Sequence, residues 1–421
     1  MKEYKNVLLS NKIPLITIPL KNAKTSTILL IVKTGSRYED RFNSGISHFL
    51  EHLFFKGTKK RPNAFALSSE LDSLGGEYNA FTAKEYTGYW VKVATAKTAQ
   101  ALDLVSDMLL NSKLAAAEIA KEKGVIIEEL NMYQDNPLMH IEDIFEICLY
   151  GDTPAGRETI GTKENILSFK RADLIKYFSQ QYGASSMKLV LAGGFGRKDI
   201  QAAKKLFAVF PNNSWQEKEA VTITQKKPQI KTVAKATDQL TLSLGVRSYP
   251  VGHPAEFVVK LLAVILGGSM SSRLFTSLRG QRGLAYYVRT ATETYSDTGY
   301  LTTQAGVPVA AAAEAVKIIL NEYRKLTTNL VGAVELRRAQ DLLAGKMLLE
   351  MEATDNLAVW YARQAVLRHQ ILTPTDFIKK IKKISALELR QTARDIFKNE
   401  GLNLATIGSV NHQALLNILK F

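Results

Sequence analysis

The sequence predicts an α/β protein built from two similar domains. Strand-like apolar runs alternate with helix-like stretches along the 421 residues, a length that suits two or three domains of about 100 to 200 residues. The tripeptide TGY occurs at residues 87–89 and again at 298–300, 211 positions later. A strand ending at Gly193 has a counterpart ending at Gly408, 215 positions later. These two matched landmarks favour duplication of one domain.

The composition narrows the class of protein. Hydrophobic residues make up 46% and charged residues 23%, as in ordinary globular proteins. The single cysteine, Cys148, excludes an internal disulfide and fits a reducing compartment. The net charge of +15 admits nucleic acid, an anionic membrane or acidic peptides as partners. No apolar run approaches the ~20 residues of a membrane span, and the N-terminus lacks the apolar core of a secretory signal. We therefore expect a soluble, cytoplasmic protein without a membrane span.

The elements follow in order from the N-terminus. Two β-rich runs cover residues 7–19 and 25–33, with a polar break at 21–24, and we expect them to form a hairpin. Ser44 is the expected N-cap of the first helix, and Gly57 marks the stop after it. Helices are expected over residues 46–54, 64–74, 97–111, 115–133, 137–150 and 198–207, and strands over 78–82, 85–93 and 187–194.

The boundary between the two domains is expected in a polar segment. The first unit closes near Pro211, and the chain then becomes lysine-rich and contains Pro228. We therefore predict domains over residues 1–215 and 237–421, joined by a linker at 216–236.

The segment HFLEH at residues 48–52 predicts a metal site. On a helix, two imidazoles four residues apart lie on one face, so His48 and His52 can hold one ion. Glu51 lies beside them and can take a proton from a metal-activated water. Two unrelated histidines are the alternative, but the chain has only 6 His. The order H-x-x-E-H is the inverted zincin pattern.

A catalytic zinc ion needs a third protein ligand, which the helix at 115–133 offers. Glu122 and Glu129 lie seven positions apart on one face of that helix. We predict Glu129 as the third ligand and Glu122 as a carboxylate that orients a ligand by hydrogen bonding. Glu128 is the alternative ligand and is otherwise expected to face solvent.

The residues around this motif resemble a known family. The segment GISHFLEHLFFKGT at 45–58 resembles the metal-binding helix of the pitrilysin/insulinase-type metallopeptidases, particularly their short bacterial branch similar to processing peptidases. In that family the third ligand is a glutamate in a stretch like EKGVIIEEL at 122–130, and Glu129 lies 77 residues after His52. The resemblance thus supports Glu129 and implies one Zn²⁺ per chain.

A further segment resembles the strand that holds the substrate in that family. NAFT at residues 79–82 is similar to the family's active-site edge strand, which pairs with an extended peptide. By this resemblance Asn79 and Ala80 flank the scissile bond, and Phe81 belongs to the same substrate-binding strand. The alternative is an ordinary edge strand.

The second half lacks a metal motif, because HPAEF at 253–257 does not supply the histidine pair. Instead, the stretch at 267–286 resembles the family's C-terminal signature, in which an arginine and a tyrosine seven apart reach the metal site. The resemblance implies that Tyr286 binds the oxyanion and that Arg279 orients it or the substrate. This sequence has Gly280 where the family commonly has an acidic residue, which leaves the local positioning of Arg279 open.

Taken over nearly the whole chain, the resemblance implies two homologous α+β domains, each a mainly antiparallel sheet with helices packed on it, arranged as a clamshell. It implies a zinc endopeptidase that cleaves extended or unfolded peptides between the domains, and it makes a homodimer plausible. The alternative is a non-catalytic scaffold or partner subunit of the same fold. A nucleic-acid binder would fit the charge of +15, but no binding motif accompanies it, so we expect no nucleic-acid partner.

Overall fold

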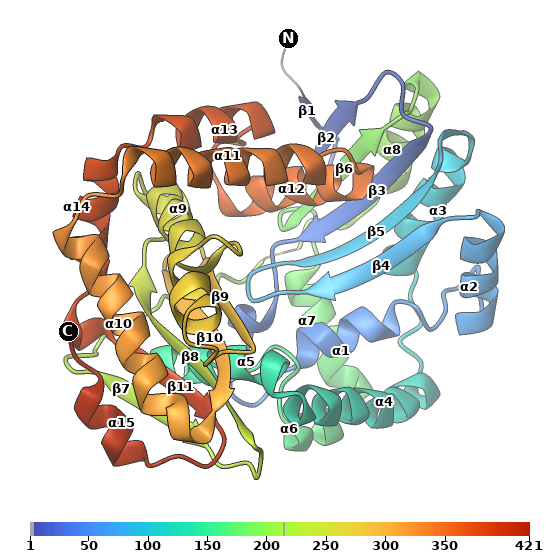
Figure 1. Cartoon of the computed structure of the whole chain (residues 1–421). Coiled ribbons are helices and arrows are strands. Elements are labelled where there is room, and N and C mark those ends of the chain that lie inside the picture. Colours follow the sequence, from blue (N-terminus) through green and yellow to red (C-terminus); the bar gives the residue numbers. More distant parts are fainter. Residues whose placement is uncertain (1–3, 214) are drawn as a thin grey trace. The chain divides into compact units, whose positions relative to one another are not determined.

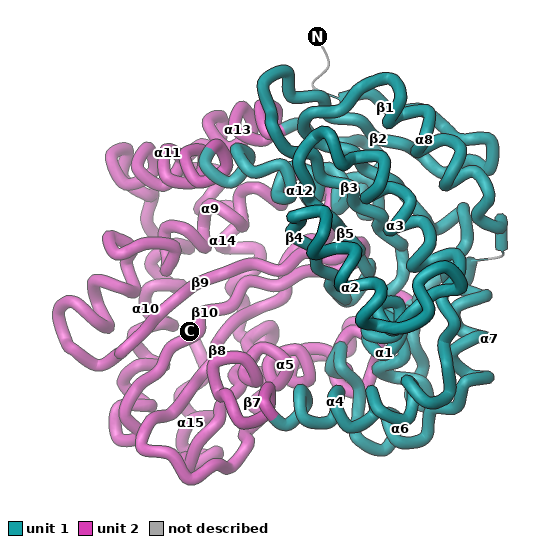
Figure 2. The backbone as a smooth tube through the Cα atoms, turned by 90° about the vertical axis from the view of Figure 1, so that its right-hand side faces the viewer, with its two compact units in different colours: residues 1–131, 158–219, 349–373 teal, residues 132–157, 220–348, 374–421 magenta. Residues whose placement is uncertain are grey.

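The computed structural model describes residues 4–213 and 215–421 and divides them into two compact units (Figure 2). Residues 1–3, part of the N-terminal segment considered above for a secretory signal, lie outside the described residues. The first unit comprises the described residues of 1–131, 158–219 and 349–373, and the second comprises 132–157, 220–348 and 374–421. The domains expected in chain order, 1–215 and 237–421, stay a prediction for the duplicated halves.

The first unit contains a six-stranded sheet in the order β1-β2-β6-β3-β5-β4 (Figure 1). Only the pair β2 and β6 is parallel among these strands, so the sheet is mainly antiparallel. The strands are β1 Lys5–Leu8, β2 Pro14–Pro19, β3 Thr25–Val32, β4 Glu77–Thr82, β5 Thr87–Ala94 and β6 Met187–Gly193. The helices that lie wholly or mostly in this unit are α1 Ile46–Leu53, α2 Ala64–Ser73, α3 Thr98–Leu110, α4 Ala116–Asp135, α6 Lys163–Ser168, α7 Arg171–Gln181, α8 Arg197–Phe207 and α12 Thr354–Leu367.

The expected hairpin between the first two β-rich runs is wrong. Strand β6 lies between β2 and β3 and pairs with both, parallel to β2 and antiparallel to β3. Nearly every residue of β6 is buried, so this strand needs a neighbour on each side and cover on both faces. A local polar break at 21–24 is compatible with either connection and could not reveal a strand more than 150 positions away.

A helix from the second half of the sequence covers one face of this sheet. Tyr361 and Ala358 of α12 pack against buried sheet residues such as Ile16, Leu29 and Val190. The hydroxyl groups of Thr354 and Thr27 also lie within hydrogen-bond distance, 2.9 Å apart. The first unit therefore depends on residues from both halves of the chain.

The second unit has a five-stranded sheet in the order β7-β11-β8-β10-β9, in which only β7 and β11 are parallel. Strand β7 lies inside the segment 216–236 that was expected to be a linker. The strands are β7 Gln229–Val233, β8 Gln239–Ser248, β9 Tyr287–Thr294, β10 Gly299–Pro308 and β11 Asn403–Ile407. The helices that lie wholly or mostly in this unit are α5 Pro137–Tyr150, α9 Glu256–Gly267, α10 Ala312–Thr328, α11 Ala333–Glu350, α13 Pro374–Lys383, α14 Ala386–Ile396 and α15 His412–Ile418.

The two sheets share one strand arrangement. Both contain a parallel pair followed by three antiparallel strands, β2-β6-β3-β5-β4 in one and β7-β11-β8-β10-β9 in the other. The exchange of helices is reciprocal, because α5 from the first half of the sequence packs its Phe145 and Ile141 with Tyr300 and Ala405 of the second unit. The prediction of two similar α+β domains with mainly antiparallel sheets is confirmed. Among the described residues, no helix combines the length and the hydrophobicity that crossing a bilayer requires.

Candidate metal centre

Helix α1 starts at a glycine. Gly45 has a left-handed conformation, with φ +98°, and a Cβ there would lie 2.5 Å from the carbonyl oxygen of Ile160. Only glycine accepts both conditions without strain. The expected N-cap Ser44 is therefore wrong, because Gly45 occupies the cap position. The buried carboxylate of Glu39 replaces a side-chain cap and accepts hydrogen bonds from the backbone N–H groups of Gly45 and Ser47 at 2.7 and 2.8 Å.

The apolar face of α1 orients its two histidines. Phe49, Leu50 and Leu53 are buried in the first unit, which leaves His48 and His52 on a half-buried face. The centroids of the two imidazole rings are 4.7 Å apart. The helical spacing on which the predicted metal pair depended is therefore present.

Helix α4 brings a carboxylate to this pair. Nε2 of His48 lies 3.7 Å from Oε1 of Glu129, and Nε2 of His52 lies 3.3 Å from Oε2. One ligand atom from each of these three residues can be chosen so that all lie within 4.8 Å of one another. The neighbouring Glu128 is exposed and lies outside this group.

Glu122 lies behind His52. Its Oε2 is 3.1 Å from Nδ1 of His52. Its Oε1 forms an ion pair with Nζ of Lys56 at 2.7 Å. The carboxylate is buried, so these two partners satisfy it in place of water. Sequence reasoning missed Lys56, which lies in the bend just after α1 ends at Leu53, where no helical spacing marks it. His48 has no equivalent support, since its Nδ1 is buried without a hydrogen-bond partner among the described residues.

The charged neighbours shift the pKa values of the two histidines in opposite directions. Burial acts to lower the pKa of His52, but hydrogen bonds to Glu122 and Glu129 outweigh it and raise that pKa to about 9. Burial and the charge of His52 lower the pKa of His48 to about 4, against the attraction of Glu129. The hydrogen bond from His52 lowers the pKa of Glu129, although burial opposes it. At neutral pH, two carboxylates thus surround one protonated and one neutral imidazole.

Glu51 lies beside the cluster and contacts the edge of the sheet. Its Oε2 accepts a hydrogen bond from the hydroxyl group of Thr82 on β4. Burial raises the pKa of Glu51, and the Thr82 hydrogen bond partly offsets this. A carboxylate with a raised pKa suits the exchange of protons at neutral pH.

Strand β4 is an edge of the first sheet, as the family resemblance implied (Figure 1). The N–H of Ala83 donates to the carbonyl of Tyr86 in the turn that follows, and antiparallel pairs alternate between bonded and non-bonded. Ala80, opposite Tyr89, therefore falls in a non-bonded pair and directs its N–H and carbonyl groups to the open edge. The side chain of Asn79 accepts that N–H at 2.9 Å.

Phe81 faces the other side of β4. Its ring packs edge-on to Tyr86, with 6.1 Å between centroids, and belongs to the surroundings of the sheet core. A Cβ on Gly88 would lie 2.2 Å from this ring, so the close approach requires glycine there. The structure thus gives Phe81 a packing contact within the first unit.

Arg279 and Tyr286 belong to the second unit. Arg279 is exposed near the end of a π-helical turn at Phe275–Gly280, with its guanidinium 5.1 Å from the ring of Phe275. Tyr286 is 75% exposed, and its backbone N–H donates to the carbonyl of Gly306. Both side chains are therefore free to contact a ligand, while the roles implied for them stay predictions.

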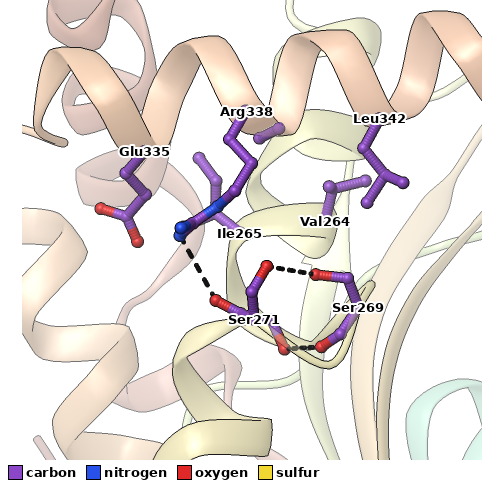
Figure 3. Close-up of a pocket in the computed structure, with 9 residues that line it drawn as sticks. Val264, Ile265, Ser269, Ser271, Glu335, Arg338 and Leu342 are labelled. Carbon is purple, nitrogen blue, oxygen red and sulfur yellow. Dashed lines mark hydrogen bonds between the residues drawn. The ribbon is translucent and has the colours of Figure 1, made fainter.

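The second unit has a recess between the end of α9 and helix α11 (Figure 3). It is less suited to binding a ligand than the cluster around His48 and His52. Its carboxylate, Glu335, is held by both arms of the guanidinium of Arg273 at 2.8 Å. Arg338 donates to the carbonyl of Ser271 at 3.3 Å. The charged groups of this recess are thus engaged within the fold.

Two family models match this chain, one in each half of the sequence. The family model described as "Insulinase (Peptidase family M16)" matches residues 15–163. The model described as "Peptidase M16 inactive domain" matches residues 168–343, which agrees with the absence of a metal motif from the second half.

Relatives with similar sequences are described as zinc proteases. One is "Uncharacterized zinc protease YmxG" of Bacillus subtilis, 32% identical over 91% of this chain and 94% of that protein. Another is an "Uncharacterized zinc protease" of Rickettsia bellii, 32% identical over 98% of this chain and 99% of that protein.

Solved structures share the fold at lower identity. A protease from Helicobacter pylori superposes with a TM-score of 0.90 at 22% identity, covering 96% of this chain and 99% of that chain. A chain of complex III2 from Candida albicans gives a TM-score of 0.86 at 15% identity, covering 99% of this chain and 100% of that chain. The family matches and the relatives above 30% identity together show that this chain belongs to the insulinase family of peptidases, family M16.

Proposed function

We propose that this protein is a zinc-dependent endopeptidase that cleaves extended or unfolded peptides. The observation that supports this most strongly is the convergence of His48, His52 and Glu129, with Glu51 on the same helix as the two histidines. A non-catalytic scaffold would have no need to keep the metal-binding residues and the carboxylate together.

The donor set fits zinc. Two imidazole nitrogens and one carboxylate oxygen are borderline ligands that zinc accepts, and three protein ligands leave a position for substrate and water. Glu122 holds Nδ1 of His52, which directs Nε2 towards Glu129. When bound, zinc supplies Lewis acidity, which polarises a peptide carbonyl and makes a water molecule more acidic.

The residues of the chain supply the remaining steps. Glu51 takes the proton from the attacking water and then delivers it to the leaving nitrogen. Its Oε1 has no hydrogen-bond partner among the described residues and is available for this transfer. The outward N–H and carbonyl of Ala80 hold the peptide extended by adding it as a strand to β4, once the Asn79 side chain releases that N–H.

The family resemblance alone implies roles for two residues of the second unit. Tyr286 would donate a hydrogen bond to the oxyanion, and Arg279 would orient it or the substrate. The clamshell chamber and a homodimer also stay predictions. Tyr286→Phe tests the first role, because it removes one hydroxyl group from an exposed side chain.

The deciding experiment is hydrolysis of a mixed quenched-fluorescent peptide pool by the purified, zinc-loaded protein. Glu51→Gln is run in parallel, with Glu118→Gln as a control because Glu118 lies on α4 and pairs with Lys121. Cleavage by the wild type and the control that is lost in Glu51→Gln would support the peptidase. Equal silence from all three, with zinc bound, would favour the scaffold or partner subunit instead.

A further inference from the structure

One polar contact joins α1 to the edge strand β4. The hydroxyl group of Thr82 donates to Oε2 of Glu51, and no other hydrogen bond to this carboxylate occurs among the described residues. Both side chains are half-buried, so water replaces this bond poorly. Thr82 is thus the one fixed hydrogen-bonding partner of Glu51 in the described structure.

The strand geometry also fixes where the backbone groups of Thr82 point. Side chains alternate along a strand, so Tyr78, Ala80 and Thr82 share one face of β4. Tyr78 stacks on Phe55, just after α1, with 6.3 Å between ring centroids, which shows that this face is turned towards the helix. Thr82 also shares the non-bonded register of Ala80, and its own N–H and carbonyl therefore point to the open edge.

We infer that Thr82 is a positioning residue that holds Glu51 in its reactive orientation and links it to the strand on which the peptide is aligned. This role rests on the proposed peptidase function. With Oε2 held, Oε1 is the oxygen that receives the proton of the attacking water. That proton passes to Glu51 and then to the leaving nitrogen, while Thr82 keeps its own proton throughout.

Removal of the Thr82 hydroxyl group alone should therefore lower peptidase activity. Valine has the shape of threonine and suits a strand, so Thr82→Val should preserve β4 while it releases Glu51. Loss of a hydrogen bond to a charged group predicts a fall in kcat of about 10-fold to 100-fold. KM should change less than about twofold, because the backbone of the edge strand remains in place.

The test compares Thr82→Val and Thr82→Ser, each zinc-loaded, on one peptide that the wild type cleaves. Thr292→Val on β9, the corresponding strand of the second unit, is the matched control. Zinc affinity and melting temperature are measured for every variant. We expect kcat to fall in Thr82→Val, to recover largely in Thr82→Ser, and to stay normal in the control, with zinc affinity unchanged throughout. In the double variant, Thr82→Val should add nothing to the loss in Glu51→Gln.

Several results would overturn this role. A normal kcat in Thr82→Val, or an equal defect in Thr82→Ser, would show that the hydroxyl group does not position Glu51. A loss of zinc affinity in Thr82→Val would transfer the effect to the metal ligands. In each case an active wild type and an inactive Glu51→Gln would leave the peptidase function intact, whereas a wild type without peptidase activity would overturn both.

Discussion

Glu122 provides a quantitative test of how the proposed metal centre is supported. Glu122→Gln keeps the size of the side chain and removes its charge. In the structure this carboxylate accepts from Nδ1 of His52 at 3.1 Å and from Nζ of Lys56 at 2.7 Å, and it is 3% exposed. A carboxamide has one acceptor oxygen, so one of these two donors would lose its partner or face an N–H group.

The expected loss of zinc affinity in Glu122→Gln can be estimated from the usual effect of a residue that hydrogen-bonds a metal ligand. Replacing a hydrogen-bonding partner of a metal ligand typically lowers metal affinity by about 10-fold to 100-fold. This corresponds to about 1.4 to 2.8 kcal/mol, in line with about 1.5 to 3 kcal/mol for a hydrogen bond to a charged group. Lys56 would in addition remain as an unneutralised cation beside the site.

The assay is competition between the protein and a zinc chelator of known affinity. Glu122 also raises the pKa of His52, whose proton competes with zinc at pH 7, and its removal would relieve part of this competition. The measurement is therefore made near pH 9, where about half of His52 is protonated in the wild type and the proton weakens zinc binding by no more than about twofold. Glu118→Gln, one turn earlier on α4, is the control, because its carboxylate pairs with Lys121 on the surface.

The expected result is a 10-fold to 100-fold weaker zinc affinity for Glu122→Gln and an unchanged affinity for the control. Equal affinities in the two variants would refute the argument that Glu122 orients His52 for the metal. A loss of the same size in both would point to general damage to α4.

Three further predictions follow from the described contacts. At pH 7 zinc binding should displace about one proton from His52, because the pKa of His52 is about 9. This proton release should fade as the pH rises above 9. Calorimetry in buffers of different ionisation enthalpy measures the number of protons released. Arg61→Met should lower the free energy of unfolding by about 3 to 5 kcal/mol, because the buried guanidinium binds three carboxylates. Lys60→Met, which removes an exposed ion pair, should lower it by about 1 kcal/mol or less. Urea unfolding measures both. Gly124→Ala, in open space on α4, should stabilise by about 0.5 to 1 kcal/mol, whereas Gly45→Ala should destabilise, because φ is +98° and a carbonyl oxygen lies 2.5 Å from the new Cβ.

Each of these has a contrary outcome. Zinc binding without proton release at pH 7 would mean that His52 is neutral before the ion arrives. An Arg61→Met protein as stable as Lys60→Met would show that the buried network contributes no net stability. A Gly45→Ala protein as stable as Gly124→Ala would show that the start of α1 tolerates a side chain.

Local chemistry in the sequence determined much of the site. The spacing of His48 and His52 depends on the pitch of one helix, so the pattern alone placed both on one face. The choice of Glu129 over Glu128 followed from the apolar periodicity of the helix expected at 115–133, and the structure places Glu129 with the histidines. The duplication was readable for a similar reason, because repeated motifs need no knowledge of contacts.

Tertiary structure decided the features that join distant segments. The position of β6 between β2 and β3, and the packing of α12 on the first sheet, unite residues more than 150 positions apart. The contact of Thr82 with Glu51 depends on where an edge strand passes a helix, which no periodicity records. An apolar face can be buried against many different segments of a chain, so the sequence does not say which one it contacts. Two residues four apart on a helix, by contrast, always lie on the same face. The sequence by itself therefore determined which groups the candidate site contains, and only the packed fold decided which neighbours hold them.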